Sequence, residues 1–279
     1  MLDKRLHAYR NDMADLRLKG KVDAKVLREG GLMQMLAPIA TLHRAPADEA
    51  PQETQVLMGE VVRVFDVAHG WAWVQLEQDN YVGYLREEFL NAKIHPPSHH
   101  VTVPSTLLYT KPDLKTQPVK FLTMNAKVTV TALQDEYVEL ATGGFVFAEH
   151  LAPIAKVKAD FVSVAEQFLH TPYLWGGKSS HGIDCSGLVQ TALHACGAFC
   201  PRDADMQENE LGSPLLINNL DGLKRGDLIF WDGHVGIMRD DTTLLHASGH
   251  QMMVVYEPLQ NVVIRSEQTG NSITKIKRL

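Results

Sequence analysis

The chain has 279 residues, of which 27 are basic and 33 acidic, and its formal net charge is −6 at pH 7. Neither sign of charge forms a long run, so the charge pattern argues against nucleic acid as a partner. No window approaches about eighteen uninterrupted apolar residues, so we expect no bilayer-spanning segment and no membrane partner. The length suits two or three small domains, each with its own core.

The amino terminus and the cysteines both bear on the compartment. The first twenty residues alternate charged with isolated apolar positions and lack the hydrophobic run of a secretory signal. The three cysteines, Cys185, Cys196 and Cys200, are an odd and sparse set, which is typical of a reducing compartment. We therefore predict a cytoplasmic protein.

Residues 1–33 form a charged segment in which Leu6, Tyr9 and Met13 stand at helix-like steps. We expect a helical or extended arm there. From residue 34 the sequence changes to short β-rich runs separated by turns at regular intervals, which is typical of a small barrel. The first barrel is expected over residues 34–96.

The β-rich pattern then repeats. Val62 aligns with Val128 at an offset of 66 residues, and the offset has fallen to 64 by Phe145. A second barrel is therefore expected over residues 97–155. Pro96-Pro97 predicts a stiff, extended linker between the two barrels.

Residues 156–279 mix helical and β patterns. One amphipathic helix is expected from about residue 159 to 169, and a second from Ser186 to about Ala195. The chain as a whole is predicted to be multidomain, with two small β-barrels followed by an α+β domain. The runs that we interpret as strands of an antiparallel sheet in this last domain are 228–231, 234–238, 244–247, 253–256, 262–264 and 273–276.

Cys185 stands where the second helix begins, between Asp184 and Ser186. A helix N-terminus offers unpaired backbone N–H groups and a partial positive charge, which lower a thiol pKa from about 8.5 and favour a nucleophile. Cys196 and Cys200 lack such a polar setting and are interpreted as packing residues. Because no CxxC pair or histidine cluster accompanies these cysteines, a zinc site is disfavoured and we expect no metal.

Two histidines complete a possible nucleophilic constellation. His234 and His246 lie twelve residues apart in a predicted hairpin. A loop with an odd number of residues would place both rings on one sheet face, at diagonal reach. One imidazole could then take the proton of the Cys185 thiol while the other fixes the tautomer of the first. Taken alone, either histidine would be an ordinary strand residue.

Five ordered segments carry a family resemblance: PYLWGG, DCSGLVQ, GDLIFW, HVGIM and HA. They resemble the NlpC/P60 family of papain-like cysteine peptidases, and the match extends over residues 156–279. Both barrels resemble bacterial SH3-type domains, the first more clearly through GEVVRV, GWAWVQ and YVGYL. The resemblance implies a papain-like catalytic domain with Cys185 as nucleophile, His234 as base and His246 as orienting residue.

The resemblance also implies a substrate and a way to stabilise its reaction. The family hydrolyses the amide between the γ-carboxyl of D-glutamate and a diamino acid in bacterial cell-wall peptides. The oxyanion formed by the attack of Cys185 would bind the backbone N–H of that residue and the hydroxyl of Tyr173, with Asp184 and Ser186 as neighbouring contacts.

Charged groups must bind the carboxylates and the free amine of such a peptide. Arg202 and Asp203 are expected to meet these charges. Family members with paired SH3-type domains close the site over the amine of L-alanine with an acidic and an aromatic residue of the first barrel, and these match Glu60 and Tyr81. Glu60, Asp184 and Asp203 would then surround one ammonium group.

We therefore predict a cofactor-free peptidase, with a monomer favoured, that recycles murein-derived peptides with a free N-terminal L-alanine. The alternatives are an exported peptidoglycan hydrolase anchored by its SH3-type domains and a non-catalytic module that binds cell-wall peptides. Acyl transfer to an amine would use the same thioester chemistry and also stays open. The sequence does not distinguish lysine from meso-diaminopimelate in the substrate.

Overall fold

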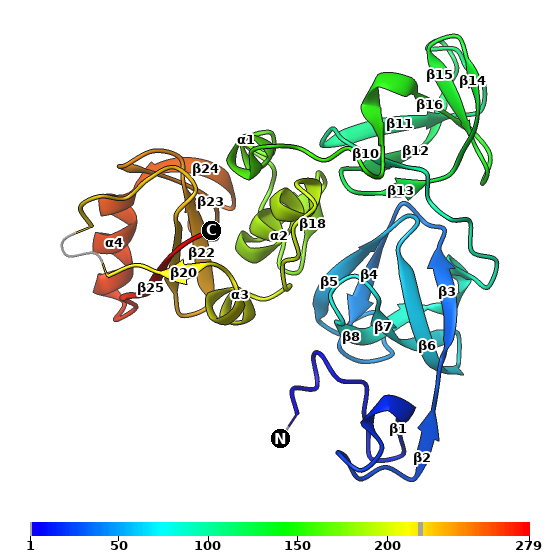
Figure 1. The fold of residues 1–279 in the computed structure, drawn as a ribbon, viewed down its shortest axis with the longest axis horizontal. Coiled ribbons are helices and arrows are strands. Elements are labelled where there is room, and N and C mark those ends of the chain that lie inside the picture. Colours follow the sequence, from blue (N-terminus) through cyan, green and yellow to red (C-terminus); the bar gives the residue numbers. More distant parts are fainter. Residues whose placement is uncertain (1, 217–219) are drawn as a thin grey trace. The chain divides into compact units, whose positions relative to one another are not determined.

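The computed structural model describes residues 2–216 and 220–279. The chain divides into two compact units, Met1–Lys156 and Val157–Leu279, which are described one at a time (Figure 1). Among the described residues, no helix has both the length and the hydropathy that a bilayer crossing requires.

The amino-terminal arm, as described from residue 2 to 33, contains short strands and no α-helix; its one helical element is the 3-10 turn Leu16–Leu18. Strand β1 (Met13–Asp15) pairs in parallel with β2 (Val26–Arg28). The arm is held by the sheet that follows it, since the backbone N–H of Val82 donates to the carbonyl of Arg5 at 2.8 Å. Tertiary hydrogen bonds and apolar contacts thus override a weak helical periodicity. The buried side chains at this joint are Ala8, Met13, Phe65 and Trp73.

The first β-domain, residues 31–91, is a seven-stranded sheet in the order β5-β4-β8-β7-β6-β3-β9. All its neighbouring strands are antiparallel. Its strands are β3 (Gly31–Met35), β4 (Ile39–His43), β5 (Gln52–Leu57), β6 (Val61–Ala68), β7 (Trp71–Leu76), β8 (Val82–Arg86) and β9 (Leu90–Asn91).

The second β-domain, residues 99–153, repeats this pairing. Its five-stranded sheet has the order β12-β11-β16-β15-β14, which duplicates β5-β4-β8-β7-β6. Equivalent turns recur at the predicted offset of 66 residues: Gly59 donates to the carbonyl of Met35, and Asn125 to that of Val101. The strands are β10 (His99–Val101), β11 (Ser105–Tyr109), β12 (Pro118–Thr123), β13 (Lys127–Val128), β14 (Val130–Gln134), β15 (Tyr137–Leu140), β16 (Phe145–Phe147) and β17 (Leu151–Pro153).

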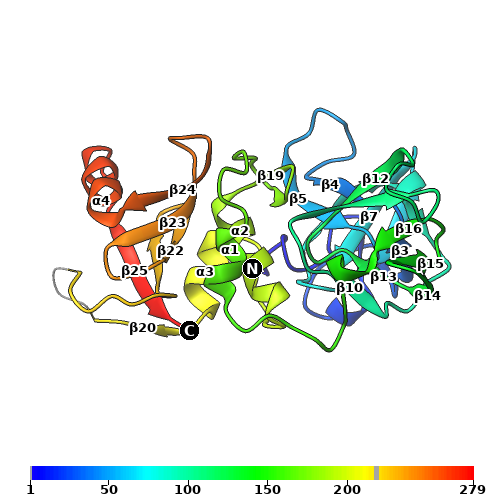
Figure 2. The same ribbon diagram turned by 90° about the horizontal axis from the view of Figure 1, so that it is seen from above.

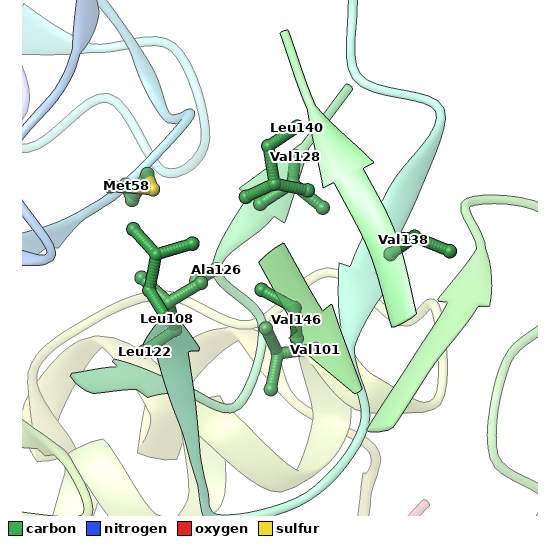
Figure 3. Close-up of a cluster of buried hydrophobic side chains, with 9 residues drawn as sticks. All are labelled: Met58, Val101, Leu108, Leu122, Ala126, Val128, Val138, Leu140 and Val146. Atoms are coloured by element: carbon green, nitrogen blue, oxygen red, sulfur yellow. The ribbon is translucent and has the colours of Figure 1, made fainter. Parts of the chain in front are cut away.

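The two β-domains pack against each other within the first unit. Met58, from the turn after β5, inserts into the core of the second β-domain (Figure 3). Its carbonyl accepts the backbone N–H of Lys127 at 2.8 Å. At Gly59 a Cβ atom would lie 2.0 Å from the Lys127 carbonyl oxygen, so only glycine fits there. This joint, rather than the Pro96-Pro97 linker alone, sets how the two domains are related.

The carboxy-terminal unit is a six-stranded antiparallel sheet in the order β20-β25-β21-β22-β23-β24. In both views, α4 covers one face of this sheet and α2 lies on the other side (Figures 1 and 2). The strands are β18 (Lys178–Ser179), β19 (Gly182–Ile183), β20 (Ser213–Pro214), β21 (Leu228–Trp231), β22 (His234–Met238), β23 (Thr243–Ser248), β24 (Met253–Pro258) and β25 (Ile273–Arg278). The helices are α1 (Phe161–Glu166), α2 (Cys185–Ala195), α3 (Ala204–Glu210) and α4 (Leu259–Gln268).

One predicted strand of this unit is wrong. Residues 262–264 lie inside α4 instead of extending the sheet. The run Val262-Val263-Ile264 suggests a strand by composition, but Leu259, Val262 and Val263 are spaced as on one helical face. All three are buried in the same apolar cluster, together with strand residues such as Ile229. Packing on the sheet therefore selects the helical period over the β-branched composition.

Candidate active site

Helix α2 begins at Cys185 because Asp184 caps it. One carboxylate oxygen of Asp184 accepts the backbone N–H of Gly187 at 2.7 Å, which satisfies a donor that the helix cannot pair internally. The other oxygen accepts the N–H of Gly176 at 2.7 Å. The cap thus ties the Gly176-Gly177 loop to the helix start and places Cys185 at the first helical position.

The guanidinium group of Arg202 stabilises this cap. Its guanidinium donates to both oxygens of Asp184, at 3.0 and 2.7 Å, and to the hydroxyl of Ser186 at 2.8 Å. The side chain is only 1% exposed. A bidentate pair of this kind is specific and strongly oriented. The sequence-based expectation that Arg202 meets substrate charges is therefore corrected, because its donors face Asp184 and Ser186 inside the unit.

The Cys185 sulfur is more enclosed than its helix position suggests, with 5% of the residue exposed. Burial raises the pKa of the Cys185 thiol to about 12, and the negative charge of Asp184 adds to this shift. The backbone N–H groups of Val235 and Ser186 act in the opposite direction. The expected thiolate is thus not the resting form, since loss of hydration outweighs the helix terminus and the thiol stays protonated.

The two histidines are in contact. His234 on β22 and His246 on β23 face each other with 2.8 Å between Nε2 of the first and Nδ1 of the second. Met238 pairs with Leu244, which leaves the odd-numbered turn 239–243 and puts both rings on one face, as the sequence predicts.

The strand that carries His234 also meets the thiol, because the next residue, Val235, donates its backbone N–H toward the Cys185 sulfur. Helix α2 packs against both β22 and β23. The fold therefore brings the helix start and the histidine pair into one region of the carboxy-terminal unit.

Both imidazoles are neutral at rest. Burial lowers the pKa of His234 to about 3, with a further contribution from His246. Burial also lowers the pKa of His246 to about 4, although the nearby Glu257 carboxylate opposes the shift. A neutral imidazole has one unprotonated nitrogen, so this pair is able to accept a thiol proton.

Tyr173 lies on the chain segment that precedes the Gly176-Gly177 loop. Its backbone N–H donates to the carbonyl of Met252 at 2.9 Å, and Tyr173 also bridges to Ile183, just before the helix cap. Burial raises the pKa of the Tyr173 hydroxyl, and the negative charge of Asp184 raises it further. The phenol therefore stays protonated as a donor, and among the described residues it makes no hydrogen bond. Its oxyanion role remains a prediction.

Asp203 occupies the cap position of α3, directly after the buried Arg202. Its side chain makes no capping bond to α3, and the residue is only partly buried. Asp203 is therefore more accessible than Asp184, which is buried next to Arg202 and Ser186.

Glu60 and Tyr81 lie in the first β-domain but have different neighbours. Glu60 is 5% exposed and accepts the backbone N–H of Leu57 at 2.9 Å, so it holds the turn that carries Met58. Tyr81 instead donates its hydroxyl to Glu53 at 3.3 Å.

Tyr81 and Glu53 line a cavity of about 540 Å³ in this domain, together with the arm residues Lys4 and Arg10. Sequence reasoning missed Glu53, which lies in β5 and forms an ion pair with Arg44.

Glu257 is a second acidic residue that sequence reasoning missed. It lies on β24, where it is paired with Leu244 of β23, and its carboxylate is 3.4 Å from Nε2 of His246. The signal in the sequence is a glutamate that ends the apolar run Val254-Val255-Tyr256. An ionisable residue in a buried strand needs a partner, and His246 is one.

A buried thiol at a capped helix start, in the same unit as two hydrogen-bonded imidazoles on neighbouring antiparallel strands, is the set of groups that a cysteine-dependent hydrolase uses. Comparison with known families agrees with this class. The NlpC/P60 family model matches residues 170–272, and the model of the bacterial dipeptidyl-peptidase SH3 domain matches residues 42–90. The predicted order of an SH3-type domain followed by an NlpC/P60 domain is confirmed.

Characterised relatives extend the likeness beyond one domain. The chain is 30% identical over 222 residues to the gamma-D-glutamyl-L-lysine dipeptidyl-peptidase of Bacillus subtilis (strain 168), a match covering 70% of this chain and 72% of the relative. It is 28% identical over 240 residues to dipeptidyl-peptidase 6 of Lysinibacillus sphaericus, covering 77% and 86%. The chain belongs to the NlpC/P60 family.

A solved structure shares the fold. The crystal structure of an NlpC/P60 family protein from Bacillus cereus ATCC 10987 superposes with a TM-score of 0.73, over 89% of this chain and 99% of that one. The sequence identity is 22%, so this likeness concerns the fold.

Proposed function

We propose that the protein is a cysteine peptidase that cleaves the amide between γ-D-glutamate and a diamino acid in cell-wall stem peptides. The observation that carries the proposal is the 2.8 Å contact between His234 and His246. His234 lies on the same strand as Val235, whose backbone N–H faces the Cys185 thiol. The relatives support the choice of bond, because one of them is named for γ-D-glutamyl-L-lysine cleavage and the other as a dipeptidyl-peptidase.

The reaction begins with a neutral thiol and a neutral base. As the Cys185 sulfur attacks the γ-carbonyl carbon, its proton moves to His234, and the carbonyl oxygen becomes an oxyanion. The backbone N–H of Cys185 and the Tyr173 hydroxyl are the proposed donors to that oxygen. The C–N bond then breaks, His234 returns the proton to the leaving amine, and a thioester remains. Water, deprotonated by His234, hydrolyses the thioester and restores the thiol.

The proposed substrate has a free N-terminal L-alanine. An enzyme that releases a dipeptide must locate the chain end two residues from the cut, and an ammonium group marks that end. Carboxylates bind ammonium groups best, so Asp203, which is only partly buried, is the candidate in the carboxy-terminal unit. Glu60 and Tyr81 also stay proposed contacts to the amine, because the family resemblance assigns them that role.

We further propose that the second β-domain is also of SH3 type, because its strand order repeats that of the first. A cytoplasmic monomer that recycles murein peptides is the setting we favour. An exported hydrolase, which would act on intact peptidoglycan, is the competing outcome.

The test is a product assay on synthetic L-Ala-γ-D-Glu-L-Lys and on its meso-diaminopimelate analogue, each with a free or acetylated alanine. We expect release of L-Ala-γ-D-Glu from the free tripeptides and a large loss on acetylation. Cys185→Ala should be inactive with an unchanged melting temperature. Equal rates on acetylated and free peptides would overturn the amine-recognition part. Release of peptide from whole sacculi at a comparable rate would favour the exported hydrolase, and a transpeptidated product would indicate acyl transfer.

A further inference from the structure

A chain of polar contacts continues behind the histidine pair, across β23, β24 and α4. Nε2 of His246 is 3.4 Å from Oε2 of Glu257, a charge contact in which this buried nitrogen makes no hydrogen bond to any described residue. Arg265 on α4 donates to both oxygens of Glu257, at 3.0 Å for the pair that includes Oε2. Gln251 donates to the same Oε2 at 3.2 Å.

The described partners of Glu257, which are Arg265, Gln251 and His246, favour its ionised carboxylate. The hydrogen bonds from Arg265 lower the pKa of Glu257, and its charge lowers it further. Glu257 is 8% exposed, so this charge is little screened by solvent. A carboxylate can only accept hydrogen bonds. The group that faces Nε2 of His246 is therefore an acceptor, and the proton of this neutral imidazole belongs on Nε2.

That single constraint determines both tautomers. A neutral imidazole has one N–H, so His246 protonated on Nε2 must accept at Nδ1. Nδ1 of His246 faces Nε2 of His234 at 2.8 Å, so the proton of that contact belongs to His234 Nε2. Nδ1 of His234 is then the nitrogen without a proton, with a lone pair ready to accept the thiol proton.

We propose that Glu257, held by Arg265, is a positioning residue that fixes the tautomers of His246 and His234 and so keeps the base ready. The proposal rests on the proposed function only in assigning His234 as the base. Glu257 also favours the reaction step, because its charge stabilises the positive charge that develops on the imidazole pair when the thiol proton arrives.

The purely structural alternative is that the Glu257–Arg265 pair only attaches α4 to the sheet. The two possibilities differ in what they change. If Glu257 is only structural, its substitution lowers the stability and does not change the histidine tautomers. If Glu257 is a positioning residue, its substitution changes the tautomers and kcat while the stability stays the same.

The first test measures the wild-type protein in the absence of substrate. In ¹⁵N NMR spectra of histidine-labelled protein at pH 7, we expect His246 and His234 both to be protonated on Nε2. Detection of His246 as the Nδ1–H tautomer would overturn the proposal. This measurement needs no activity, so it separates the inference from the proposed function. If the predicted tautomers occurred in a protein inactive on every tripeptide, the function would fail and the inference would stand.

The second test is Glu257→Gln. In this variant Arg265 would donate to the amide oxygen of the glutamine. The NH₂ group of the glutamine would then face Nε2 of His246. That nitrogen must then accept, both tautomers reverse, and His234 loses its free Nδ1. We expect kcat to fall by about 10- to 100-fold, a typical loss for residues that orient a functional imidazole. KM should change little.

Two further variants serve as controls for Glu257→Gln. Glu257→Asp keeps the charge, so its tautomers should match those of the wild type and its kcat should exceed that of Glu257→Gln. Glu267→Gln makes the same chemical change at an exposed position of the same helix and should leave kcat unchanged. Wild-type kcat and tautomers in folded Glu257→Gln would refute the proposal. If Glu257→Gln does not fold, the wild-type spectra and Glu257→Asp still decide the question.

Discussion

Substitution of Arg202 by methionine tests whether this residue supports the helix start or binds substrate. The variant removes the bidentate contact to Asp184 and the bond to Ser186, and it leaves a buried carboxylate with its backbone donors and the Ser186 hydroxyl but no countercharge from Arg202. Hydrogen bonds to charged groups contribute about 1.5–3 kcal/mol each, and breaking one side of a buried ion pair costs about 3–5 kcal/mol. We therefore expect Arg202→Met to lower the stability of the carboxy-terminal unit by about 3–5 kcal/mol.

For a unit of the size of Val157–Leu279, this loss corresponds to a fall in Tm on the order of 10–25 °C. Thermal denaturation followed by near-ultraviolet circular dichroism measures it, and steady-state kinetics on the same sample measure KM. A Tm within about 2 °C of the wild type, combined with a raised KM, would refute the structural role and restore the substrate-binding interpretation.

Two companion variants sharpen the result. Arg239→Met breaks a half-exposed contact with Glu166 at 3.4 Å and should change stability by less than about 1 kcal/mol. The double variant Asp184→Asn/Arg202→Met removes both charges, so it should be more stable than Arg202→Met alone.

Three further predictions concern the Cys185 thiol, the carboxylates of Asp203 and Glu60, and the oxyanion donor Tyr173. Because burial raises the pKa of Cys185 to about 12, the free enzyme should show no thiolate absorbance at neutral pH, and its alkylation by iodoacetamide should accelerate with each pH unit toward 12; a rate plateau near pH 7 would contradict this. Asp203→Asn should raise KM for free-amine tripeptides at unchanged Tm, whereas Glu60→Gln should also lower Tm because Glu60 accepts the Leu57 N–H; KM and Tm measured on both variants test this. Tyr173→Phe should lower kcat by about 100- to 1,000-fold, the range for loss of one oxyanion donor; an unchanged kcat would exclude Tyr173 from that role.

Local sequence determined much of the framework. Asp184 before Cys185 specifies a capped helix start, since the cap and the N–H that it accepts lie three residues apart. The parity of the His234–His246 spacing places both rings on one face once the turn is known. The β-domain repeat follows from side chains that recur at a fixed offset, because each copy must bury the same strand positions. These features depend on neighbours along the chain, and a sequence pattern records them directly.

Tertiary structure alone decided which charged groups are available. Arg202 reaches Asp184 across 18 residues, and Tyr81 reaches Glu53 across 28, so no local pattern reveals either pairing. The neutral state of the thiol also comes from burial by other elements, which outweighs the helix terminus that the sequence displays.

The helical conformation of α4 and the role of Glu257 also depend on tertiary contacts and not on local sequence. The β-branched run in α4 favours a strand locally, but packing on the sheet selects the helix. Glu257 acquires its meaning from His246 on the next strand and Arg265 on that helix. Burial and the pairing of charges depend on all the elements that surround a residue. They are therefore fixed only when the chain has folded.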